Sequence, residues 1–158
     1  MGNLFMNTSR KNIREVVQQV LCLSLVLALG FQGQSAFGQS ELATQYYKEG
    51  SSKFEAGRYP EAAELYRKAY EAEVKTAQPR EKWLINMAGY MGVAYYYAEN
   101  YTAAIEPLKI AINLASKVND LPHFAYFNYI LGQVYYQKGD YQMAMFYSSG
   151  SYQAYNSQ

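Results

Sequence analysis

The sequence contains three copies of one segment, and this internal repeat limits the fold more than any other feature. The copies align without a gap: GSSKFEAGRYPEAAELYRKA from Gly50, GVAYYYAENYTAAIEPLKIA from Gly92 and GQVYYQKGDYQMAMFYSSGS from Gly132. Intervals of 42 and 40 residues separate the three glycines. The same two intervals recur at a tyrosine and at an alanine, namely Tyr59, Tyr101 and Tyr141, and Ala62, Ala104 and Ala144. One period at three markers predicts a stack of similar supersecondary units.

Each copy has the pattern of two helices joined by a turn. Apolar residues recur at i, i+3, i+4 and i+7 in its first half, and the turn follows as AGRY, AENY or KGDY. Asn100 and Asp140 are predicted caps of the second helix. Pro107 lies inside a second helix and is expected to bend it on its outer surface. Pro79 and Pro122 are expected to open the next first helices.

The pattern resembles the tetratricopeptide repeat (TPR), whose motif reads W-x2-L-G-x2-Y and then A-x3-F. The second copy matches at Met91, Gly92, Tyr95, Ala104, Leu108 and Ala111. The third matches at Leu131, Gly132, Tyr135 and Ala144, with Ser148 and Ser151 where large and small apolar residues are usual. The resemblance implies an all-α fold, an α-solenoid of three antiparallel helix hairpins in a right-handed superhelix. It places the repeats at about residues 43–76, 85–118 and 125–158.

The first 38 residues have the composition of a signal peptide, which leaves residues 39–158 as the TPR domain. Three basic residues precede the apolar run VLCLSLVLALGF at 20–31, and small residues follow at Ala36 and Gly38. Twelve apolar residues are too few to span a bilayer, which needs about 20. We therefore expect cleavage after Gly38, export to the periplasm or the medium, and no membrane span afterwards. An uncleaved N-terminal anchor is the alternative. Cys22 lies inside the apolar run, so the processed chain would have no thiol.

The charged and titratable residues exclude several classes of function. The formal net charge of +1 gives no basic field for nucleic acid. The only histidine, His123, follows Pro122 and is expected to be solvated or to cap a helix. Four acidic residues alternate with basic ones as on a solvated helix face, namely Glu61, Glu64, Glu71 and Glu73. We expect no catalytic residues, no metal and no cofactor.

Tyrosines and charges divide unevenly along the chain. Thirteen of the 18 tyrosines lie from residue 83 onward, where only seven charged residues occur. In TPR proteins the first helices line a concave groove, and the resemblance implies a groove formed here by Tyr47, Phe54, Asn86, Tyr96, Tyr97, Tyr126, Tyr129, Gln133 and Tyr136. Tyrosine buries a large rigid area and keeps a hydroxyl for hydrogen bonds. We expect this groove to bind an extended or helical segment of another protein, although packing between helices could also occupy the same rings.

The C-terminal end of the predicted solenoid provides a second candidate surface. Met145, Phe146 and Tyr152 lie on the last helix, with no predicted helix to cover them. Self-association into a homo-oligomer, coverage by a partner, and local fraying are the alternatives. The leading interpretation is a non-catalytic adaptor that binds other proteins in the cell envelope. A carbohydrate or cell-wall binder and a self-assembling structural subunit are the competing ones.

Overall fold

The computed structural model describes residues 38–157, which form six helices and no strand. The predicted signal peptide, apart from Gly38, lies outside the described residues. The first described helix covers residues 38–55. The others are α2 (Tyr59–Val74), α3 (Glu81–Tyr97), α4 (Tyr101–Lys117), α5 (Leu121–Gln137) and α6 (Tyr141–Asn156).

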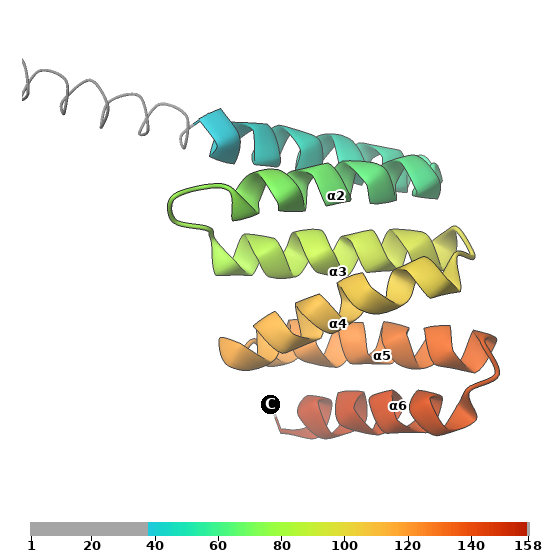
Figure 1. The fold of residues 1–158 in the computed structure, drawn as a ribbon. Helices are drawn as coiled ribbons and strands as arrows, with labels where there is room; N and C mark the ends of the chain where they lie inside the picture. The colour runs from blue at the N-terminus through green and yellow to red at the C-terminus, as the bar shows by residue number, and fades with distance from the viewer. Residues whose placement is uncertain (1–37, 158) are drawn as a thin grey trace, which may run out of the picture. The chain divides into compact units, whose positions relative to one another are not determined.

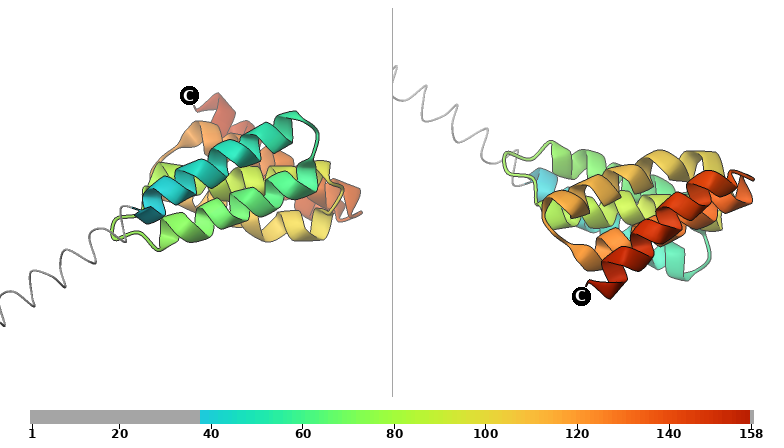
Figure 2. Two further views of the ribbon diagram at one scale, coloured as in Figure 1. Left: turned by 90° about the horizontal axis from the view of Figure 1, so that it is seen from above. Right: turned by 90° about the horizontal axis from the view of Figure 1, so that it is seen from below.

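These helices form three antiparallel hairpins stacked in chain order (Figure 1). The helix 38–55 pairs with α2, α3 pairs with α4, and α5 pairs with α6. The first helices of successive hairpins also meet, because the Tyr47 ring lies 5.4 Å from Trp83 and the Tyr90 ring lies 6.2 Å from Phe127. Views along the stack show the helix 38–55 and α6 at its two ends (Figure 2). The predicted all-α solenoid of three hairpins is confirmed.

The turn within each hairpin follows one local design. The Asn100 side chain accepts from the backbone N–H of Ala103 at 3.2 Å, and Asp140 accepts from that of Met143 at 3.1 Å. Both predicted caps are therefore confirmed. The residue two positions before the second helix has a positive φ in every turn: Gly57, Glu99 and Gly139. A left-handed conformation favours glycine, so the second turn carries a strained residue at this place.

Small residues allow the helices to approach closely. A Cβ added to Gly92 would lie 2.5 Å from Leu108 Cγ, which explains the glycine marker of the repeat. A Cβ added to Gly89 would lie 2.0 Å from Phe127 Cζ, so α5 packs directly on the backbone of α3. Phe127 is fully buried in the main core with Leu131 and Val134. The core thus runs between hairpins as well as within them.

Two sequence-based expectations about exposed positions are wrong. Pro107 is buried within α4 rather than on an outer surface. Glu73 is fully buried rather than on a solvated face, because Arg80 closes the loop after α2 onto it. Pro122 lies in the first turn of α5 as expected. Pro79, by contrast, lies in the loop, and α3 begins two residues later.

Candidate functional site

The predicted groove residues nearest the hairpin turns form an aromatic cluster. The Phe54 ring lies 5.6 Å from that of Tyr97, and Tyr97 also contacts Tyr96 at 5.4 Å. Tyr59, at the start of α2, stacks on Tyr97 at 5.2 Å with an interplanar angle of 26°. Phe54 and Tyr96 are half-buried, whereas Tyr97 is exposed. The cluster therefore fixes Tyr97 from two sides and leaves part of its ring accessible.

The phenol groups of Tyr96, Tyr97, Tyr126 and Tyr129 come close enough to influence one another. Burial, followed by the nearby phenols of Tyr90 and Tyr97, raises the pKa of Tyr126. Burial also raises the pKa of Tyr96, and the phenols of Tyr101, Tyr97 and Tyr129 add to the effect. Neighbouring phenolates would repel one another, so the nearby phenols favour the protonated forms of Tyr96 and Tyr126. Tyr96 and Tyr97 of α3 and Tyr126 and Tyr129 of α5 thus make up an uncharged aromatic surface, here called the phenol surface, on which Tyr97, Tyr126 and Tyr129 are exposed.

Tyr47 and Asn86 have a different environment. The Tyr47 ring packs against Tyr66, Trp83 and Tyr90 at 5.4, 5.4 and 6.4 Å. Burial, with smaller effects from Tyr66 and Tyr90, raises the pKa of Tyr47 to about 12. The Oδ1 atom of Asn86 is buried and has no hydrogen-bond partner among residues 38–157. Tyr47 therefore joins the helix 38–55 to α3 through its ring contacts, whereas Asn86 Oδ1 adds no hydrogen bond to this interface.

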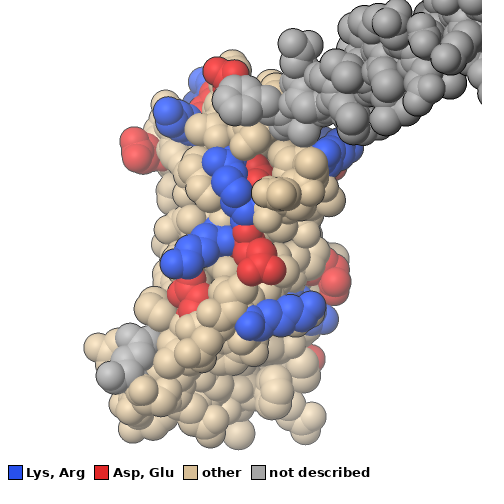
Figure 3. All heavy atoms as spheres, turned by 90° about the vertical axis from the view of Figure 1, so that its left-hand side faces the viewer, with Lys and Arg blue, Asp and Glu red and all other residues tan. Residues whose placement is uncertain are grey.

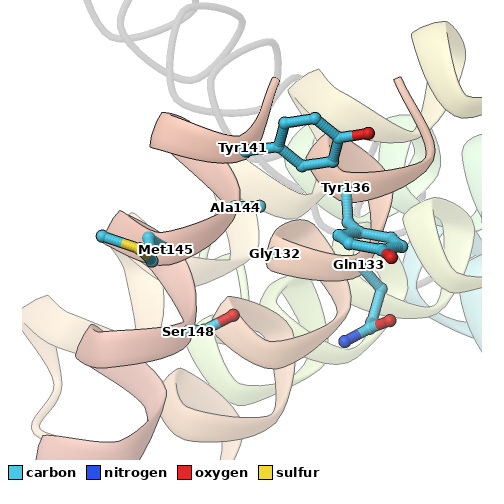
Figure 4. Close-up of a pocket in the computed structure, with 7 residues that line it drawn as sticks. All are labelled: Gly132, Gln133, Tyr136, Tyr141, Ala144, Met145 and Ser148. Atoms are coloured by element: carbon cyan, nitrogen blue, oxygen red, sulfur yellow. The ribbon is translucent and has the colours of Figure 1, made fainter. Parts of the chain in front are cut away.

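Gln133 and Tyr136 line a pocket of about 430 Å³ between α5 and α6. Its other lining residues are Gly132, Tyr141, Ala144, Met145 and Ser148. The Ser148 hydroxyl points toward α5, whereas Met145 extends away from it (Figure 4). The residue equivalent to Ser148 is Tyr66 in the first hairpin and Leu108 in the second, and each of these larger side chains packs over a glycine. Serine is too small to fill this space, which explains the pocket.

Tyr126 and Tyr129 line a second pocket, of about 320 Å³, farther along the same two helices. Pro122 and Ala125 from α5, and Ser151 and Tyr155 from α6, complete its lining. The two pockets therefore follow the line where α5 meets α6. We call this surface the end face, defined by the residues that line the two pockets together with Tyr152.

Repeat symmetry explains why the end face is exposed. Gly89 and Val93 in α3 are equivalent to Tyr129 and Gln133 in α5, and both are buried beneath α5. No described helix covers α5 in the same way. The large exposed residues of α5 have 40 to 58% of their surface accessible, namely Tyr126, Tyr129 and Tyr136. The structure thus places four predicted groove residues on the end face, namely Tyr126, Tyr129, Gln133 and Tyr136. Tyr126 also borders the phenol surface around Tyr97.

The residues predicted for self-association divide between two sides of α6. Met145 and Tyr152 share a helical stripe with the pocket residues, at i, i+4, i+7, i+11 and i+14 from Tyr141. Phe146 lies off this stripe and packs edge-on against Tyr147 at 5.2 Å. Sequence analysis did not select Tyr141, Ser148 or Tyr155 for this surface. Their regular spacing of three and four residues was the available signal.

The electrostatics of the described residues differ between the two ends of the stack. Charged side chains gather on the upper part of the face in Figure 3, and the lower part, formed by the third hairpin, is almost free of them. Neither α5 nor α6 contains a Lys, Arg, Asp or Glu. His123 pairs with the cap residue Asp120, with 2.8 Å between Nδ1 and Oδ2. Within residues 38–157, no group of His, Cys, Asp and Glu could hold a metal, and no helix is long and apolar enough to span a membrane.

Comparison with known proteins identifies the family. A family model described as tetratricopeptide repeat matches residues 47–82 and 91–149, which is more than half of the chain. The protein therefore belongs to the TPR family, whose domains are generally non-catalytic scaffolds that commonly bind other proteins.

Among solved structures, the fold is similar to that of BtubC (BKLC) from P. vanneervenii, with a TM-score of 0.58 and 12% sequence identity. The match covers 78% of this chain and 57% of that one, so this chain spans little more than half of its length. At this identity the likeness shows the fold alone. No curated protein matches the chain.

Proposed function

We propose that the protein is a non-catalytic adaptor that binds a segment of another protein on the phenol surface formed by Tyr96, Tyr97, Tyr126 and Tyr129. The observation that supports this most is the exposure of Tyr97, Tyr126 and Tyr129 on two successive first helices. Membership of the TPR family supports protein binding in general. The enrichment of exposed tyrosine supports this surface in particular.

The chemistry of the surface determines which segment would fit. Rigid rings with free hydroxyls bind apolar side chains and accept or donate hydrogen bonds, but they offer no charge to pair. A segment with apolar and amide side chains would therefore bind better than an acidic or basic one. Because the Tyr97 ring is already held by Phe54 and Tyr59, little rotational entropy is lost on binding.

The experiment is an affinity capture with the 158-residue protein as bait and envelope extract as the source of partners. A Tyr97→Ala, Tyr126→Ala variant should lose the captured protein, because both rings are exposed and central to the phenol surface. Phe146→Ala is the matched control, since it removes an even more exposed ring from another side of the molecule. Equal capture by both variants would show that the phenol surface is not the binding site. The carbohydrate-binding alternative would be favoured if the unmodified protein bound purified glycan and the Tyr97→Ala, Tyr126→Ala variant did not.

We also propose that the protein acts outside the cytoplasm, after removal of residues 1–38. The basic residues, the apolar run and the small residues before Gln39 support this location. Mass spectrometry of the protein recovered from its native cells should give an N-terminus at Gln39. Recovery of the intact chain in the cytosol would contradict export.

A further inference from the structure

The helix α6 carries a stripe of exposed residues that has no function in the proposed adaptor. Five residues lie on it, at alternating spacings of four and three: Tyr141, Met145, Ser148, Tyr152 and Tyr155. Its four large side chains have 65 to 76% of their surface exposed. Seen from below, α6 is the outermost helix of the described stack (Figure 2). A 4-3 spacing of large apolar residues is the pattern by which one helix packs against another.

We propose that two copies of this protein associate through this stripe, with their α6 helices antiparallel and related by a twofold axis near Ser148. The stripe is nearly symmetric about Ser148, which has a large residue three or four positions away on each side and a tyrosine seven positions away on each side. Antiparallel pairing places Met145 of one copy against Tyr152 of the other, a favourable sulfur–aromatic contact. The small Ser148 at the axis allows the two helices to approach closely.

The opposite end of the stack excludes a head-to-tail arrangement of copies. The exposed stripe of the helix 38–55 has the same 4-3 spacing but consists of Glu41, Gln45, Lys48, Ser52 and Glu55. Packing this stripe on α6 would bury three charges against rings that cannot pair with them. The α6 stripe of a second molecule, by contrast, carries no charge and is mostly apolar. Chemical complementarity therefore favours a closed twofold dimer over an open fibre.

The accessible area is sufficient for such a dimer. Aromatic side chains bury about 150–250 Å² each, so the stripe together with Tyr129 and Tyr136 offers about 700 Å² per copy. Stable specific interfaces bury roughly 600–1,000 Å² per partner, a range that includes this area. The 430 Å³ pocket beside Ser148 adds a cavity that a side chain of the second copy can enter.

A cysteine cross-link tests both the dimer and its symmetry in the full chain. In a Cys22→Ser background, which removes the natural cysteine, Ser148→Cys should form a disulfide between two copies in mild oxidant, because the two positions meet at the axis. Ser149→Cys is the matched control, because it is exposed but lies away from the stripe. Cross-linking of Ser149→Cys as fast as Ser148→Cys would overturn the proposed pairing.

Sedimentation equilibrium provides the second measurement. The unmodified chain should be a dimer at micromolar concentration, and Met145→Lys should raise the dimer dissociation constant roughly 100-fold, because each interface would bury two unpaired charges. Met145 is exposed in the single copy, so helical content should not change. Phe146→Ala should leave the dimer intact. A strict monomer at all concentrations, as expected if a different protein covers the stripe, would refute the proposal. Tyr97→Ala alone tests the adaptor function separately: it should weaken capture and leave this dimer unchanged, since Tyr97 lies outside the end face.

Discussion

At the scale of single residues, the three repeats allow one position to be compared in three local contexts. Gly57, Glu99 and Gly139 occupy the same place in their turns, with φ values of 72°, 58° and 77°. Only Glu99 carries a Cβ there, and its left-handed conformation costs about 1–2 kcal/mol. The repeat therefore tolerates this cost once, at the second turn.

Glu99→Gly should stabilise the protein by about 0.5–1 kcal/mol. Relief of the left-handed strain exceeds the extra entropy that glycine gives to the unfolded chain. Urea unfolding followed by circular dichroism measures the change. Gly139→Ala is the converse control and should destabilise the protein by a similar amount. A loss of stability in Glu99→Gly would show that the side chain, rather than its backbone, matters at this turn.

The ion pair of Glu73 with Arg80 is the residue-scale feature that most affects stability. Glu73 is completely buried, and its carboxylate accepts from the Arg80 side chain at 2.6 and 2.9 Å and from the Arg80 backbone N–H at 2.8 Å. These hydrogen bonds, opposed by burial, lower the pKa of Glu73. Arg80 also lies 4.3 Å from the Trp83 ring centroid, so one side chain connects the loop to two helices.

Arg80→Ala should cost about 3 kcal/mol, because it leaves the Glu73 carboxylate buried without its partner. Arg67→Ala is the matched control: Arg67 pairs with Glu64 and Glu71 on the surface, so its removal should cost less than about 1 kcal/mol. Because the pKa of Glu73 is lowered by folding, its contribution is present above the unfolded pKa and is lost as pH falls. The difference between wild type and Arg80→Ala in denaturant titrations should therefore shrink in acid. Equal costs for both variants would contradict the buried pair.

At the scale of helices, the contact between α3 and α5 depends on Gly89. The Phe127 ring occupies the space where a side chain would project, and Tyr90 and Tyr126 pack around that ring at 6.2 and 5.3 Å. The equivalent positions in the other first helices are Tyr47 and Tyr129. Of the three first helices, α3 alone has a glycine at this position.

Gly89→Ala should destabilise the protein by about 1–3 kcal/mol, because the new methyl group would displace Phe127 from a filled core. The control is Gly150→Ala in α6, where the nearest atom to an added Cβ is Asn128 Oδ1 at an ordinary contact distance of 3.5 Å. That change should be nearly neutral, since alanine also favours the helix. Thermal unfolding of both variants decides the matter, and a stable Gly89→Ala would mean that α3 and α5 can separate at little cost.

At the scale of the whole molecule, the second and third hairpins have many neutral tyrosines and few charged side chains, both between their helices and on their surface. Folding raises the pKa of several phenols, chiefly by burial, and that of Tyr47 reaches about 12. The first hairpin, residues 38–74, carries 12 charged residues, whereas the helices of the third carry none of the four charged types. Packing of rings therefore stabilises the solenoid, and ionisation of these rings opposes it.

Raising the pH should unfold the protein between about pH 10 and pH 12. A phenol with a raised pKa in the folded state supports folding fully below its unfolded pKa of about 10, and this support disappears as pH rises through the folded value. Loss of helical circular dichroism should coincide with the appearance of tyrosinate absorbance. Tyr47→Phe should shift the transition to higher pH. Complete ionisation without loss of helix would show that the rings are not packed as described.

Binding of the captured protein should change little between low and high salt. The phenol surface has no ion pairs to screen, whereas binding through charges weakens as salt is added. Titration calorimetry at two salt concentrations measures the effect. A steep loss of affinity would place the binding site on the charged first hairpin instead.

Much of the fold could be predicted from contiguous stretches of sequence, because helix period, caps and turns are local properties. The hairpins, the caps at Asn100 and Asp140 and the family itself followed from such stretches. The burial of Glu73 could not be predicted, since it depends on Arg80 seven residues away closing a loop. The predicted groove residues are only partly brought together, because the exposure of a first-helix residue depends on the next hairpin.

The sequence alone thus determined the repeating unit and the number of its copies, since glycine, tyrosine and alanine recur at fixed intervals that only stacked hairpins explain. Tertiary structure alone decided which tyrosines are accessible. Val93 is buried and Gln133 lines an open pocket although they are equivalent in the repeat. The physical reason is coverage: α5 lies over the former, and no described helix lies over the latter.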